Sequence, residues 1–186
     1  MDNGASSYRR FREDGDAEGL AEIIREYRDG LIMYLCTYVH DFNTAEELAE
    51  DTFVYLGTKK PRDKGGSAFG TWLYAMARRI ALSYLRKAKR RGEYLTENCG
   101  EIPQDEITLE ESYIREERRI TVHRAMRGLK PEYAQILWLV YFERMSVKDA
   151  ARVMNKSAHN AETLVYRARN ALKAKLLEEG FVYEDI

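Results

Sequence analysis

The stretch FGTWLYAMARRIALSYLRKAKRR, residues 69–91, decides the fold class of this chain. At about 100° per residue, a helix gathers its large apolar side chains on one arc, namely those of Trp72, Leu73, Met76, Ile80 and Tyr84. Basic side chains fall roughly on the opposite arc, namely those of Arg78, Arg79, Arg86, Lys89 and Arg90. We therefore predict a helix that packs through one face and meets anions with the other.

The rest of the chain favours an all-α fold. Apolar residues make up 45% of the 186 residues, which is enough for real cores, and only three prolines occur. Apolar residues recur at helical spacing through residues 20–39, and a second helix is expected to begin at Thr44 and to stop at Gly57. Alternating Val/Ile/Thr-rich runs, which indicate strands, are missing. Since no apolar stretch approaches the roughly 18 residues of a spanning helix, we expect no membrane insertion.

Charge is arranged in blocks, although the net charge is only −1. Residues 1–58 carry a net charge of −8, residues 59–91 of +10, residues 92–117 of −8 and residues 118–180 of +7. Two basic blocks separated by an acidic segment indicate two contacts with polyanions, joined by a self-repelling linker; the alternative is that the charges only solvate helix faces. The predicted organisation is a first domain over 1–91, an acidic linker over 92–117 and a second domain over 118–186.

The second half of the chain carries two capped helices at helix-turn-helix spacing. Ser146 caps the first, Asp149 occupies the capping-box position, and Asn155 suits a left-handed C-terminal residue. Ser157 caps a longer helix over 158–179. A helix of eight or nine residues, a turn and a second capped helix are typical of helix-turn-helix proteins. On the longer helix the helical wheel points His159, Thr163, Tyr166, Arg167 and Asn170 outward.

The sequence carries no signal for catalysis, a metal or a cofactor. It has no phosphate-cradling glycine loop, no metal-ligand spacing and no Ser/His or Cys/His pairing. Its three histidines are scattered, and Cys36 and Cys99 form no disulfide framework. The first residues lack the apolar core of a signal peptide. We expect a cytoplasmic protein with reduced thiols, no cofactor and no enzymatic activity.

Two stretches resemble a known family. NTAEELAEDTFVYL followed by residues 69–91 looks like region 2 of the extracytoplasmic-function (ECF) sigma factors, and LKPEYAQILWLVYFERMSVKDAARVMNKSAHNAETLVYRARNALKAKL looks like their region 4. The resemblance covers about residues 16–91 and 118–178, with a variable linker between them as in the family. It implies two small helical domains that bind bacterial RNA polymerase core and direct promoter recognition, promoter melting and transcription initiation.

The resemblance also implies a docking surface for the polymerase. In the family, the region 2 helix that begins near Asn43 docks on the clamp helices of the largest subunit, and the flap is a further contacted part of the core. Exposed acids beside apolar side chains form a rim-and-anchor interface for a basic partner helix. The matching residues are Glu47, Leu48, Glu50, Asp51 and Phe53. Many family members are held inactive by an anti-sigma protein that covers the polymerase-facing surfaces, so such a protein is a candidate partner.

The resemblance assigns recognition of the melted minus-ten element to the basic loop and the helix after it. A single strand is held by positive charge along its backbone, by aromatic stacking and by a pocket for an unstacked base. The matching residues are Lys59, Lys60, Arg62 and Lys64 of the loop and Phe69, Trp72, Tyr74, Arg78, Arg79, Arg86 and Arg90 of the helix. Core packing is the alternative role of Phe69 and Trp72. Arg79 replaces a common Asn and Gly70 a bulkier residue, which puts the usual minus-ten preference in doubt.

The last long helix resembles the family's reader of double-stranded minus-thirty-five DNA. The contact positions match Glu162, Thr163, Tyr166 and Arg167, preceded by His159 and Asn160, and phosphate contacts are expected from Arg144, Lys148 and Lys156. Arg167 can make a bidentate contact to guanine, worth roughly 1–3 kcal/mol of discrimination. Glu162 stands where the family usually has Lys or Arg, and Leu164 replaces a common Arg. A carboxylate repels phosphate but accepts from cytosine N4, so either base preference is altered or upstream binding is weak.

Three other functions compete with this one. A helix-turn-helix regulator that acts without polymerase explains residues 118–178, but not the acidic helix, basic loop and Trp-bearing helix of the first half. A helical enzyme lacks the motifs that catalysis requires. A degenerate sigma factor, whose region 4 mainly binds protein, is suggested by Glu162.

Overall fold

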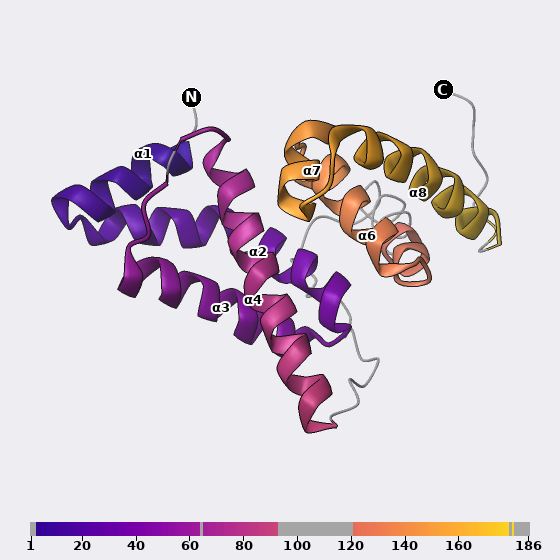
Figure 1. Cartoon of the computed structure of the whole chain (residues 1–186), viewed down its shortest axis with the longest axis horizontal. Coiled ribbons are helices and arrows are strands. Elements are labelled where there is room, and N and C mark those ends of the chain that lie inside the picture. The colour runs from indigo at the N-terminus through magenta and orange to yellow at the C-terminus, as the bar shows by residue number, and fades with distance from the viewer. Residues whose placement is uncertain (1–2, 64, 93–120, 179, 181–186) are drawn as a thin grey trace, which may run out of the picture.

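The computed structural model describes residues 3–63, 65–92, 121–178 and 180, and these residues form helices and turns without a β-strand (Figure 1). The first half contains α1 (Asn3–Arg9), the π-helical turn η1 (Arg10–Asp14), α2 (Ala17–Val39), α3 (Phe42–Lys59) and α4 (Phe69–Arg91). In the second half residues 121–127 are helical, and α6 (Pro131–Leu137), the π-helical turn η2 (Trp138–Phe142), α7 (Val147–Met154) and α8 (Ala158–Glu178) follow. The all-α prediction is confirmed. The acidic linker beyond Gly92 lies outside the described residues.

Capping side chains fix where helices begin, and one of them differs from the residue expected from the sequence. Asp16 caps α2 by accepting a hydrogen bond from the amide of Glu18 at 3.0 Å. α3 is capped by Asp41, which accepts from the amide of Thr44 at 2.8 Å, so the helix begins at Phe42 and not at Thr44. Both Asp41 and Thr44 are residue types that cap helices, and the carboxylate placed earlier in the chain takes that role.

Gly57 does not stop α3, contrary to expectation. The helix runs to Lys59, and Lys60 is the residue that adopts the left-handed conformation, with φ of 43°. A Cβ at Gly57 would lie 3.2 Å from Leu20 of α2. The glycine therefore allows α2 and α3 to approach closely.

The core of the first half lies among α2, α3 and α4. Its fully buried large side chains include Ile23, Leu31, Tyr34, Leu35, Leu56, Phe69, Leu73 and Tyr74. Burial of each such side chain contributes roughly 1.5–3 kcal/mol before entropy is subtracted. α4 is buried over a wider arc than its apolar stripe predicts, because α2, α3 and α7 all contact it.

The helix-turn-helix prediction is confirmed. The hydroxyl of Ser146 accepts from the amide of Asp149 at 3.1 Å and donates to its carboxylate at 2.6 Å. Asn155 ends α7 in the left-handed conformation with φ of 54°. Ser157 then accepts from the amide of Asn160 at 3.2 Å and starts α8. Buried alanines, among them Ala150 and Ala161, let the two helices cross closely.

The two halves contact each other through α2 with α6 and through α4 with α7 (Figure 1). The approach is close at Gly30 of α2, where a Cβ would lie 2.5 Å from Oε1 of Glu143 and 2.6 Å from the hydroxyl of Tyr74. Burial, followed by the nearby Glu143 carboxylate, raises the pKa of Tyr74 well above its usual value. The phenol is therefore neutral where the halves meet.

Candidate nucleic-acid interface

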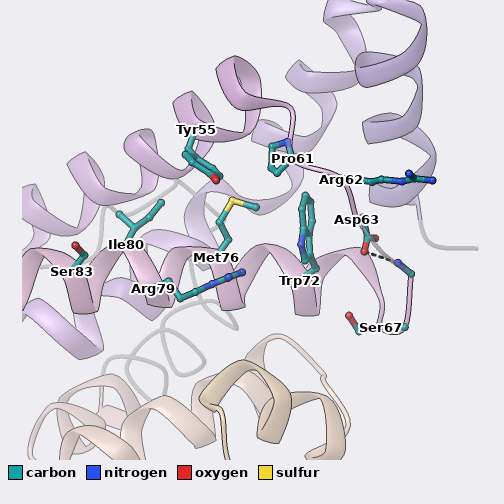
Figure 2. Close-up of a pocket in the computed structure, with 12 residues that line it drawn as sticks. Tyr55, Pro61, Arg62, Asp63, Ser67, Trp72, Met76, Arg79, Ile80 and Ser83 are labelled. Carbon is teal, nitrogen blue, oxygen red and sulfur yellow. Dashed lines mark hydrogen bonds between the residues drawn. The ribbon is translucent and has the colours of Figure 1, made fainter.

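A cavity of about 660 Å³ lies between the end of α3, the loop after it and α4 (Figure 2). Apolar side chains and the loop backbone form much of its wall, and two arginines stand at it. Its lining residues are Tyr55, Pro61, Arg62, Asp63, Gly65, Gly66, Ser67, Trp72, Met76, Arg79, Ile80 and Ser83. A nucleobase is a flat ring system with polar edges, and this combination of aromatic face, apolar wall and cations suits it.

The loop that closes this cavity is shaped by a turn at its tip. The carboxylate of Asp63 accepts a hydrogen bond from the amide of Gly65 at 3.0 Å, drawn as the dashed line in Figure 2. Gly65 and Gly66 have φ of 63° and 151°, which are unfavourable for residues with a Cβ. α4 starts directly after this turn, with Ala68 at the cap position and without a side-chain cap.

Most of the predicted minus-ten residues are accessible. Trp72 is half-buried and lines the cavity, while Lys64 lies outside the described residues. Of the cations predicted for this site, those that are exposed are Lys59, Lys60, Arg62, Arg79, Arg86 and Arg90. Arg62 and Arg79 also line the cavity, so charge and ring converge on the same space.

Three predicted minus-ten residues need correction. Phe69 and Tyr74 are 1% and 0% exposed, so core packing is the role that the structure gives them. Arg78 is half-buried and its Nε atom is fully buried. α4 packs against α1, α2, α3 and α7, and the 3.6-residue pattern did not show this second buried flank.

The predicted reading face of α8 is open. His159, Asn160, Glu162 and Arg167 are exposed, and Tyr166 is 70% exposed. Thr163 is half-buried, and its hydroxyl donates to the carbonyl of His159 at 3.1 Å. Of the expected phosphate contacts, Arg144 and Lys148 are exposed, whereas Lys156 pairs with Glu132 at 3.3 Å.

The acidic face of α3 is only partly as expected. Glu47, Glu50 and Asp51 are exposed. Leu48 and Phe53, expected as apolar anchors beside them, are 3% and 6% exposed because they belong to the core. The exposed apolar side chains of this helix are instead Val54 and Tyr55, at 59% and 43%.

Comparison with protein families gives two matches in chain order. Residues 23–91 match the model of sigma-70 region 2, and residues 119–172 match the model of sigma-70 region 4. The chain belongs to the ECF group of sigma-70 factors. It is 27% identical to RNA polymerase sigma factor YlaC of Bacillus subtilis, over 86% of this chain and 92% of YlaC. It is 28% identical to ECF RNA polymerase sigma factor BldN of Streptomyces coelicolor, over 89% of this chain and 62% of BldN.

Solved structures share the fold of this sigma factor. One is the sigma factor RpoE from Bartonella quintana in complex with the anti-sigma factor NepR, with a TM-score of 0.68, 21% identity, and coverage of 86% of this chain and 98% of RpoE. Another is CnrH in complex with the cytosolic domain of CnrY, with a TM-score of 0.61 and 17% identity. This match covers 95% of the present chain and 96% of CnrH. The sigma factor directs transcription initiation, and its two matched regions carry the cavity and the helix-turn-helix, respectively.

Several residues of the region 2 cavity were missed from the sequence. Pro61, Met76 and Ile80 line it, together with Tyr55 of α3. The loop before residue 69 was identified from its basic charge. Charge gives no reason to choose a neutral residue such as Pro61. Val54 and Tyr55 are adjacent large apolar residues that directly follow the acids of α3, and such a pair was a usable signal because exposed apolar side chains often mark a contact.

Within the described residues, no group of three or more His, Cys, Asp or Glu side chains is placed to hold a metal ion. The same described helices include none that is both long and apolar enough to cross a bilayer.

Proposed function

We propose that this sigma factor reads a promoter at two places: region 2 holds the melted minus-ten strand, and region 4 holds the minus-thirty-five duplex. The observation that carries the proposal is the cavity of about 660 Å³ with Trp72 at its wall and Arg62 and Arg79 beside it. An unstacked base enters the cavity, and the exposed cations of the loop and α4 hold the phosphates on either side.

Capture of a flipped base supplies part of the free energy of melting. Unstacking and unpairing a base costs a few kcal/mol, and base–aromatic stacking returns about 1–3 kcal/mol per base. Phosphate contacts add a term that is independent of sequence. The cavity therefore discriminates between bases, while Lys59, Arg86 and Arg90 increase affinity for any strand.

Region 4 supplies contacts with the duplex. α8 carries Tyr166 and Arg167 on its exposed face, where an apolar ring suits a thymine methyl and a guanidinium suits guanine. Glu162 lies exposed on the same helix and favours cytosine at the base pair it faces. Arg144 and Lys148 neutralise phosphates at the edge of the groove.

The face for polymerase consists of the exposed acids of α3, Glu47, Glu50 and Asp51, with Val54 as their apolar neighbour. Leu48 and Phe53 support this face from beneath and make no direct contact. The flap is a second contact of the core, and the exposed rings of Tyr141 and Phe142 are suited to it.

We further propose that an anti-sigma factor regulates this chain, because the similar RpoE structure holds the anti-sigma factor NepR. The chain acts in the cytoplasm, where the polymerase works, and it is non-catalytic.

A reconstitution experiment tests the proposal. Core polymerase with the full-length chain should produce run-off transcripts from a defined site on genomic fragments. Footprints without transcripts would favour the polymerase-independent regulator. The degenerate sigma factor, motivated by exposed Glu162, predicts transcripts that are unaffected by scrambling the upstream element.

A further inference from the structure

The helices α1 and η1 precede the part of the chain that matches region 2. They pack against the outer side of the wall of the cavity proposed to hold a minus-ten base. Tyr8 of α1 is 4% exposed, and its hydroxyl donates a hydrogen bond to the carbonyl of Pro61 at 2.6 Å. Its ring centroid lies 5.3 Å from that of Trp72. Pro61 and Trp72 both line the cavity (Figure 2). Tyr8 is not among its lining residues.

Tyr8 thus contacts two wall residues that come from different elements. Pro61 belongs to the loop and Trp72 to α4. The hydroxyl contacts the start of the loop, and the ring contacts the indole. We expect a change in either contact to alter the width or the orientation of the cavity without removing a lining side chain.

The segment that carries Tyr8, α1 and η1, is itself packed against α4 and hydrogen-bonded to α2. A Cβ at Gly4 would lie 2.5 Å from Phe69, which shows how closely α1 sits on the start of α4. Ser7 donates to the carboxylate of Glu22 of α2 at 2.6 Å, and Arg10 pairs with the same carboxylate. The ring of Phe11 lies 4.6 Å from Nζ of Lys60, next to Pro61 in the loop.

Tyr8 stays protonated and can therefore always donate this hydrogen bond. Burial, the largest cause, raises the pKa of Tyr8 to about 12. The phenol keeps its proton throughout the physiological range, and the carbonyl of Pro61 can only accept.

We propose that Tyr8 is a positioning residue for minus-ten recognition, holding Pro61 and Trp72 at the spacing that an unstacked base requires. The inference rests on the proposed function, because it assigns Tyr8 to the same cavity. Tyr8 never touches DNA and acts only through the two wall residues.

The test compares Tyr8→Phe, which keeps the ring and loses the hydroxyl, with Tyr34→Phe. Tyr34 is fully buried in α2, and its hydroxyl bonds that of Tyr38 at 2.8 Å, so this control loses a hydrogen bond of the same kind elsewhere in region 2. In the free proteins, hydrogen exchange should be faster at the amides of residues 65–67 in Tyr8→Phe than in the wild type or the control. Equal exchange in all three would overturn the inference.

In the reconstituted holoenzyme, affinity is measured for non-template strands that carry each of the four bases at each minus-ten position. Tyr8→Phe should lower the discrimination between the four bases about three- to tenfold at one minus-ten position, which is the size of effect expected from the loss of one hydrogen bond. Discrimination at the other positions should stay unchanged. A uniform loss of affinity at every position, or no change at any, would overturn it. If the wild-type holoenzyme itself shows no base preference, the proposed base-reading function of the cavity fails, and not only the role inferred for Tyr8.

Discussion

The indole of Trp138 donates a hydrogen bond from Nε1 to Oε1 of Glu143 at 2.9 Å, and this carboxylate lies against α2 at Gly30. Burial, the largest cause, raises the pKa of Glu143 above its usual value, although the nearby Tyr74 hydroxyl and the hydrogen bond from Trp138 oppose the shift. A buried carboxylate is thus present at the contact between the two halves.

Glu143 should make stability depend on pH. Since its pKa is higher in the folded state, the folded state binds the proton more tightly, and the free energy of unfolding falls as pH rises from the ordinary carboxyl pKa through the raised one. Glu143→Gln, whose side-chain carbonyl can still accept from Trp138, removes this dependence. Urea unfolding of both proteins between about pH 4.5 and 7.5 should show that the free energy of unfolding of the wild type rises relative to that of the variant as pH falls. A difference that is constant with pH would contradict the buried position of the carboxylate.

Gly30→Ala should weaken the contact between the halves. Its Cβ would lie 2.5 Å from Glu143 and 2.6 Å from Tyr74, and such overpacking typically costs about 1–3 kcal/mol. Small-angle scattering should show a larger radius of gyration, and thermal unfolding a lower Tm. Gly15→Ala is a control with free space around its Cβ but a left-handed φ of 71°, so it strains the backbone without touching the contact. An unchanged radius in Gly30→Ala would argue against the contact.

Asp41→Ala should destabilise the start of α3 by about 1 kcal/mol, because the amide of Thr44 loses its acceptor. Hydrogen bonds from Thr44 hold the pKa of Asp41 below its usual value. The contribution of Asp41 is therefore present above the ordinary carboxyl pKa and lost as pH falls through the lowered one. Thr44→Val, which keeps the amide, is the companion variant. Chemical denaturation near neutral pH should rank Asp41→Ala as the less stable of the two.

Asp51→Lys and Val54→Ala should weaken binding to core polymerase with little effect on the Tm, since both side chains are exposed. The charge reversal should act mainly on the association rate and its salt dependence. Phe53→Ala should instead lower the Tm, because Phe53 is 6% exposed and its loss leaves a cavity. Gel filtration with core and scanning calorimetry separate the effects. Co-elution unaffected by both surface changes would remove α3 from the polymerase interface.

Arg167→Ala and Lys148→Ala should affect DNA differently. Loss of a bidentate base contact by Arg167 costs about 1–3 kcal/mol at one base pair and relaxes specificity there. Loss of a phosphate contact by Lys148 weakens all sequences alike and reduces the slope of log affinity against log salt by about 1. Titration of promoter fragments at several salt concentrations measures both quantities. Identical effects of the two variants would contradict their assigned roles.

The sequence by itself determined the helical class, the helix-turn-helix and the location of the cationic surfaces. These are local properties: a cap such as Ser146 needs partners within three residues, and the apolar stripe of residues 69–91 follows from 3.6 residues per turn. The acids of α3 and the exposed residues of α8 were predicted for the same reason.

Only the tertiary structure decided which flanks of those helices face a neighbour. The family resemblance assigned Leu48, Phe53, Phe69 and Tyr74 to contact surfaces, with core packing as the alternative for Phe69, and all four lie in the core. A matched motif does not give the number of helices that surround a side chain. The contact of Tyr8 with Pro61 spans 53 residues, a separation at which no local pattern operates. The cavity is lined by residues between Tyr55 and Ser83, which are close in sequence, but its shape depends on how the end of α3 and the loop pack against α4.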